Sequence, residues 1–124
     1  MTWLPKAKRD APWNLSITSK GSLVLSPNLV ASWGAETHVA LTPEFEGAQR
    51  DLILSPTSPD APEALRVKTL PGGEGIVDIR EFLEEQGIEV AGQPPSVVRY
   101  VAESDGAGWR VNLRNPVEGS LTRV

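Results

Sequence analysis

The stretch ITSKGSLVLSPNLVASWG, residues 17–34, decides how the first part of this chain folds. Apolar residues alternate with polar or small ones at residues 15–17 and again at 23–25, as they do on half-buried strands. Lys20-Gly21 lies between these runs, and glycine supplies the positive φ that a tight hairpin turn requires. The pattern therefore predicts a β-hairpin.

A very short helix is predicted directly after this hairpin. Ser26 is a preferred N-cap residue, and Pro27 loses no hydrogen bond at the first helical position. The apolar residues at positions 29, 30 and 33 share one face, and Gly34 marks the end. Because nucleating so short a helix is costly, packing on the strands must stabilise it.

The rest of the chain is predicted to consist of short strands and one more helix. Residues 38–44 and 50–56 form a second hairpin, and the proline-containing stretch 57–62 is a linker. A strand at 64–70, a turn at 71–75, a strand at 76–79 and a helix at 80–86 follow, and the helix ends at Gly87. Asp78 and Glu81 have the spacing of a capping box at its start. Residues 88–95 are expected to form a loop, and the runs 97–103 and 109–113 a closing hairpin.

The two halves of the chain repeat one pattern. With a shift of 53 residues, Leu23-Val24 aligns with Ile76-Val77, and Gly34 aligns with Gly87. After the extra loop the shift becomes 59, and Leu52 aligns with Val111. These matches indicate an internal structural duplication. The alternative is that hairpin–helix–hairpin patterns recur by chance in a β-rich chain.

The hairpin, the helix that begins at proline and the second hairpin, residues 17–56, resemble the AbrB/SpoVT/MazE group of swapped-hairpin proteins. With its second unit the whole chain resembles MraZ-like architecture, in which two such units lie in one polypeptide. The resemblance implies intertwined strands, frequent dimers, and DNA-binding transcription regulators or antitoxins. Two positions depart from the family, because Ser22 and Asn28 stand where it commonly has basic residues.

The predicted fold is therefore mainly β, with two β-hairpin–short-helix units that form one compact, intertwined, barrel-like domain. We expect five parts: a basic and aromatic arm at 1–13, a first unit at 14–56, a Pro-rich linker at 57–63, a second unit at 64–114 and a tail at 115–124.

Composition narrows the function classes. The 124 residues carry a formal net charge of -4 and contain no cysteine, which excludes disulfides and thiolate metal sites. The sequence contains no nucleophile-elbow motif and no phosphate-binding loop, and a lone histidine, His38, is a weak metal or base candidate. We therefore expect no enzyme activity, no cofactor and no metal, and a cytoplasmic location with no membrane association.

Two functions remain open. The first is a small AbrB-like regulator that binds duplex DNA, expected to be a homodimer, with phosphate contacts from Lys6, Lys8, Arg9 and Lys20. The second is a protein-interaction module (adaptor, inhibitor or antitoxin-like) that has kept the fold and lost the DNA surface. Its contact residues would be Trp3, Trp13, Glu81, Glu84 and Glu85. For the basic residues, the alternative is an ordinary solubilising surface.

Overall fold

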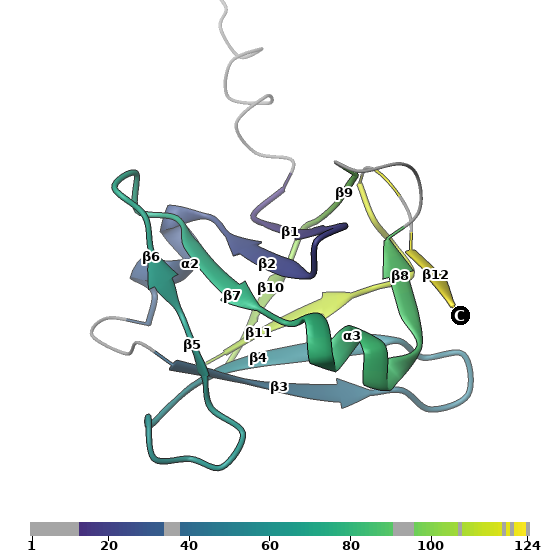
Figure 1. Ribbon diagram of the computed structural model, residues 1–124, viewed down its shortest axis with the longest axis horizontal. Coiled ribbons are helices and arrows are strands. Elements are labelled where there is room, and N and C mark those ends of the chain that lie inside the picture. The colour runs from purple at the N-terminus through teal and green to yellow at the C-terminus, as the bar shows by residue number, and fades with distance from the viewer. Residues whose placement is uncertain are drawn as a thin grey trace, which may run out of the picture.

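The computed structural model describes residues 13–33, 38–90, 96–106, 108–117, 119 and 121–123 of the chain (Figure 1). The described part is mainly β with two short helices, which confirms the predicted fold class. The helices are α2 (Pro27–Ala31) and α3 (Arg80–Gln86). The strands, in chain order, are β1 (Leu15–Thr18), β2 (Ser22–Leu25), β3 (His38–Glu44), β4 (Asp51–Thr57), β5 (Leu65–Arg66), β6 (Lys68–Thr69), β7 (Gly75–Asp78), β8 (Ile88–Val90), β9 (Val97–Tyr100), β10 (Glu103–Asp105), β11 (Gly108–Asn112) and β12 (Leu121–Arg123).

The described strands form two five-stranded sheets and one strand pair. Sheet A has the order β6-β7-β2-β1-β9, sheet B has the order β10-β11-β4-β3-β5, and β12 pairs with β8. In Figure 1, β1, β2 and β7 lie above β3, β4 and β11. The hydrophobic core takes buried side chains from both sheets, including Leu15, Leu25, Val77, Val39, Leu54 and Val111. The strand pairing thus gives two packed sheets, and the predicted barrel is not closed.

The first hairpin forms as predicted. β1 and β2 are antiparallel, with Leu15 opposite Leu25 and Ile17 opposite Leu23, and all four side chains are buried. The turn closes when the Gly21 amide donates to the Thr18 carbonyl at 3.0 Å, with Gly21 at φ 88. A Cβ at this glycine would lie 2.8 Å from Arg80 Cβ, so the turn packs directly on the start of α3.

Helix α2 begins as the sequence predicts. The Ser26 hydroxyl accepts a hydrogen bond from the Leu29 amide at 3.3 Å, and proline occupies the first turn. Leu29 is fully buried and fixes the helix against the strands. The helix ends at Ala31 with Ser32 as its C-cap, whereas Gly34, its predicted end, lies outside the described residues.

The second predicted hairpin is also present. β3 and β4 pair antiparallel along their whole length, from His38 opposite Thr57 to Glu44 opposite Asp51. β4 is a central strand of sheet B, since it also pairs with β11. Its buried Leu52 and Leu54 alternate with half-buried residues, which is the period-two pattern seen in the sequence.

The single strand predicted at 64–70 is wrong, because this segment passes from one sheet to the other. β5 pairs with β3 in sheet B, and β6 pairs with β7 in sheet A. Val67, between them, is only 6% exposed and anchors the crossing in the core. The segment does alternate as the sequence indicates, but its first part pairs within sheet B and its last part within sheet A.

The predicted capping box at α3 is wrong. The N-cap is Ile79, which makes no side-chain cap bond, and Asp78 Oδ1 instead accepts from the Arg80 amide at 3.1 Å. Ile79 is 1% exposed, so its burial in the core sets where the strand ends and the helix begins. The C-terminal end is as predicted, because Gly87 takes the left-handed conformation at φ 67.

The predicted closing hairpin is half wrong. β10 and β11 do pair, but β9 pairs antiparallel with β1 in sheet A, with Tyr100 opposite Leu15. The chain changes sheets at residues 101–102. There the Asn14 side chain holds Ala102, accepting its amide at 2.8 Å and donating to its carbonyl at 3.1 Å. Residues 97–100 of the predicted run therefore belong to sheet A, and only its last residue, Glu103, pairs with β11.

The loop predicted at 88–95 is wrong in its first part. Residues 88–90 form β8, which pairs antiparallel with β12, with Ile88 opposite Arg123. The predicted tail, 115–124, supplies the second strand of the pair, more than thirty residues later in the sequence, so no local pattern could reveal this pairing. Figure 1 shows this pair at the right of the molecule, beyond α3.

Candidate functional site

The predicted site residues are only partly described. Trp3, Lys6, Lys8 and Arg9 lie outside the described residues. Lys20 is exposed in the β1–β2 turn and forms no ion pair within the part of the chain that the structure describes. Trp13 is 38% exposed at the start of β1, at the end of the strand opposite this turn.

Exposed apolar side chains gather at one place. Among the described residues, the exposed large hydrophobic side chains are Trp13 at 38%, Val101 at 45% and Val117 at 50%. Two of them contact Arg99: its guanidinium carbon lies 5.1 Å from the centre of the Trp13 ring, and its carbonyl accepts from the Val117 amide at 2.8 Å. Val101 follows Arg99 by two positions, just after β9 ends. We call this set the β9 patch.

The predicted acidic residues lie on α3, away from the β9 patch. Glu81, Glu84 and Glu85 are all exposed on this helix. α3 follows β7 and packs at the turn end of β1, whereas Trp13 precedes the other end of β1. In sheet A, β2 and β1 stand between β7 and β9. The structure therefore does not bring Trp13 and the acidic residues into one contact surface.

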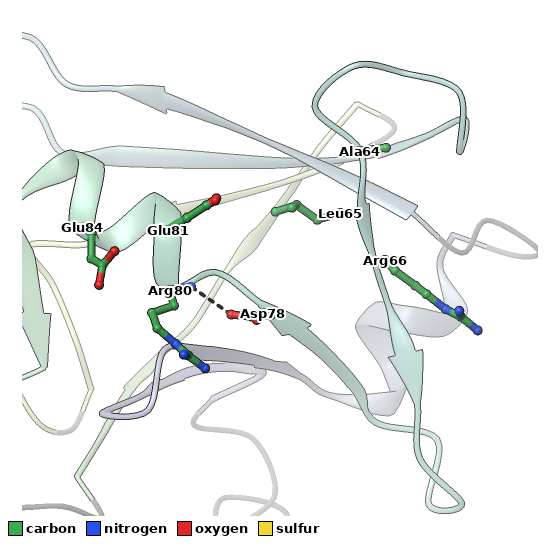
Figure 2. Close-up of a pocket in the computed structure, with 7 residues that line it drawn as sticks. All are labelled: Ala64, Leu65, Arg66, Asp78, Arg80, Glu81 and Glu84. Atoms are coloured by element: carbon green, nitrogen blue, oxygen red, sulfur yellow. Dashed lines mark hydrogen bonds between the residues drawn. The ribbon is translucent and has the colours of Figure 1, made fainter.

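An open pocket of about 450 Å³ lies between α3 and β5. Positively charged, negatively charged and apolar side chains line this pocket. They are Ala64, Leu65, Arg66, Asp78, Arg80, Glu81 and Glu84. Figure 2 shows the guanidinium groups of Arg66 and Arg80 on opposite sides, with Asp78 beside Arg80. Because cations and carboxylates are interspersed here, the pocket has no single sign of charge with which to select a ligand.

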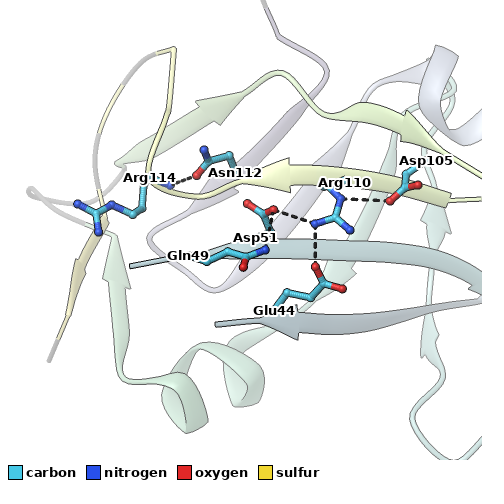
Figure 3. A network of polar contacts seen from close by, with 7 residues as sticks. All are labelled: Glu44, Gln49, Asp51, Asp105, Arg110, Asn112 and Arg114. Atoms are coloured by element: carbon cyan, nitrogen blue, oxygen red, sulfur yellow. Dashed lines mark hydrogen bonds and ion pairs between the residues drawn. The ribbon is translucent and has the colours of Figure 1, made fainter. Parts of the chain in front are cut away.

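Among the described residues, a cluster of ion pairs is built around Arg110, on β11 (Figure 3). Arg110 Nη1 donates to Glu44 Oε1 and to Asp51 Oδ2, each at 2.8 Å, and its Nε donates to Asp105 Oδ2 at 3.1 Å. These hydrogen bonds, that to Glu44 foremost, raise the pKa of Arg110 above its ordinary value. The cluster joins β3, β4, β10 and β11, so it is a structural tie across sheet B.

The described part of the chain contains neither a metal-ligand cluster nor a helix that could span a membrane. Within residues 13–33, 38–90 and the later described segments, no three His, Asp or Glu side chains are placed to hold a metal ion. His38 is half-buried at the start of β3. No described helix is long and apolar enough to cross a membrane.

Sequence reasoning missed three of the four residues of the β9 patch. The run VVRYVAE alternates, so burial of Val98 and Tyr100 places Arg99 and Val101 on the outer face. The alternation was visible in the sequence, but the run was predicted to pair with residues 109–113. It pairs with β1 instead, so Trp13 was not recognised as a neighbour of Arg99. Val117 had no local signal, because its place beside Arg99 depends on a contact across eighteen residues.

Comparison with known proteins adds nothing to this description. No protein-family model, curated protein or solved structure matches the chain.

Proposed function

We propose that this protein is a non-enzymatic protein-interaction module that binds a partner protein through the β9 patch. The observation that carries the proposal is the clustering of the exposed large hydrophobic side chains of the described residues around Arg99. Tryptophan and arginine dominate binding hot spots, since both offer large contact area with a polar group. An exposed apolar cluster with this composition is typical of an interaction site.

The charge distribution favours this function over DNA binding. Acidic residues outnumber basic ones by 16 to 12 in the chain, and Arg110 is held by three carboxylates. Affinity for nucleic acid comes from cations that neutralise phosphates, so basic residues committed to internal ion pairs contribute little. In this proposal, the resemblance to swapped-hairpin proteins is used only for the expected fold, and the interaction function is inferred from the β9 patch. A cytoplasmic location is part of the proposal.

The test is an affinity capture with the immobilised full-length chain and two matched variants. The patch variant is Trp13→Ala/Val117→Ser, and the control is Glu81→Ala/Glu84→Ala/Glu85→Ala on α3. We expect the wild type and the control to retain the same stoichiometric protein, and the patch variant to bind it roughly 30-fold more weakly, as loss of a hot spot predicts. Unchanged thermal unfolding shows that each variant is folded.

Two results would contradict this assignment. If the patch variant binds as well as the wild type, the β9 patch is an ordinary surface. If the glutamate variant alone loses the partner, the contact surface is the acidic face of α3.

DNA binding is the second candidate, and one observation favours it. The close packing of Gly21 on Arg80 brings Lys20 and Arg80 together, and neither forms an ion pair within the described part of the chain. Polarisation binding to random duplex DNA across a salt series tests it. A DNA-binding protein loses affinity linearly with log salt, and Lys20→Ala reduces that slope by about one if Lys20 contacts a phosphate.

A further inference from the structure

The pairing between β2 and β7 has a local twofold symmetry. Leu23 lies opposite Val77, and Val24 lies opposite Ile76. Leu23 and Val77 are both fully buried, whereas Val24 and Ile76 are both half-buried, so the equivalent of Leu23 is Val77, at a shift of 54 and not the 53 read from the sequence. With this shift the axis passes through the Leu23–Val77 pair, and the pairs Val24–Ile76 and Ser22–Asp78 exchange with each other. The two strands therefore meet as two copies of one strand would meet across a twofold axis.

The pairing between β4 and β11 obeys the same rule with the second shift. Leu52 lies opposite Val111, its own equivalent at a shift of 59, so the axis passes through this buried pair. On either side, the pairs Ile53–Arg110 and Asp51–Asn112 exchange with each other under the same shift. Both sheets are thus centred on a contact between equivalent strands, in the orders β6-β7-β2-β1 and β10-β11-β4-β3.

The contacts between turns and helices are reciprocal as well. Gly21, in the turn of the first half, packs on Arg80, the first residue of α3. Gly73, in the turn of the second half, packs on Pro27, the first residue of α2, where a Cβ would lie 3.2 Å from the proline Cβ. Both glycines have positive φ, at 88 and 94. Each half therefore supports the helix of the other.

The charges at the axis break this symmetry. Asp51 and Arg110 occupy equivalent positions at the shift of 59, and they form an ion pair with each other at 2.8 Å. If two first halves met in this way, two carboxylates would face each other; two second halves would bring two guanidinium groups together. Like charges so close repel, and charge complementarity is a common device for choosing a partner.

We infer that the chain is a self-paired double unit whose first half, 14–56, fits only the second half, 64–114, of the same chain. The interaction surface consists of the edges of β2 and β4 on one half and of β7 and β11 on the other. Both edges are used within one polypeptide, so the homodimer expected from the sequence is not needed to complete either sheet. The ion pair Asp51–Arg110 makes the pairing directional.

The natural absence of cysteine offers a direct test in the full-length chain. Val24 and Ile76 are directly opposite and half-buried, and antiparallel partners have Cα separations that a disulfide can span. We expect Val24→Cys/Ile76→Cys to oxidise to a disulfide within one chain, seen on a non-reducing gel as a monomer that migrates faster than its reduced form.

Two matched variants define the background. In Val24→Cys/Lys68→Cys the cysteines lie two strands apart, roughly 9.5 Å, so no internal disulfide is expected. Ser22→Cys/Val24→Cys reports pairing between like halves, because residue 24 of one copy would then lie opposite residue 22 of the other, and this variant should stay monomeric. Disulfide-linked dimers of the Val24→Cys/Ile76→Cys chain, a dimer of the Ser22→Cys/Val24→Cys variant, or failure of the paired cysteines to oxidise would each overturn the inference.

Discussion

Tyr100 offers the sharpest test of how the two sheets are held together. It is fully buried at the end of β9, and its hydroxyl donates to the Leu113 carbonyl at 3.0 Å, just beyond β11. Tyr100→Phe keeps the ring and leaves no cavity, but it leaves the Leu113 carbonyl without this bond. An unsatisfied buried acceptor costs about 1–2 kcal/mol, which for a domain of this size lowers Tm by roughly 3–10 °C.

The same residue predicts a dependence of stability on alkaline pH. Burial raises the pKa of Tyr100 above its ordinary value of 10.0, so the folded protein keeps a proton that the unfolded chain releases. The unfolded state binds fewer protons above that pH, and the free energy of unfolding falls there by up to about 1.4 kcal/mol per pH unit. Below it, the contribution of Tyr100 is constant. In the Tyr100→Phe variant, the part of the alkaline fall in the free energy of unfolding that is due to Tyr100 should be absent.

Two measurements check this reasoning. Urea unfolding of both proteins at neutral pH and at several alkaline values gives the difference in stability, with equal m-values expected. Because Tyr100 is the sole tyrosine, ultraviolet absorbance of tyrosinate reports its ionisation alone. Equal stability of the two proteins at neutral pH, or tyrosinate formation at the ordinary pKa in the folded protein, would refute the argument.

Three further predictions concern the turns, the helix start and the charge cluster. Ser26→Ala removes the N-cap of α2 and should lower the free energy of unfolding by about 1 kcal/mol in urea, with Ser104→Ala, exposed on the edge strand β10, as a neutral control. Gly108→Ala places a Cβ against the Leu54 carbonyl in the centre of sheet B, so this variant should unfold at a clearly lower temperature in calorimetry. Arg110→Asp should lower Tm because it gathers like charges, and combining it with Asp51→Arg should recover part of the loss; a swap no more stable than the single variant would show that the pair is not coupled.

The local structure was predictable wherever its cause was local. The Lys20-Gly21 turn, the Ser26 cap, the β3–β4 hairpin and the Gly87 helix end each depend on residues close in sequence, and all four are present. These features follow from propensities and periodicity over a few positions.

The errors came from contacts between distant segments. Nothing near Val67 states that its two flanks bond to different sheets, and β8 needs a partner from the C-terminal tail. The β9 patch has the same origin, since Arg99 and Val101 were read with the wrong neighbour. Alternation identifies a strand and its buried face, but not the sheet that receives it.

The side chain of Asn14 has a consequence for the order in which this protein opens. Its amide oxygen accepts from the Ala102 amide and its nitrogen donates to the Ala102 carbonyl, so one side chain satisfies both backbone groups of a residue that is 3% exposed. A buried backbone group without a partner costs about 1–3 kcal/mol. Loss of this one amide would therefore favour local opening where the chain crosses from β9 to β10.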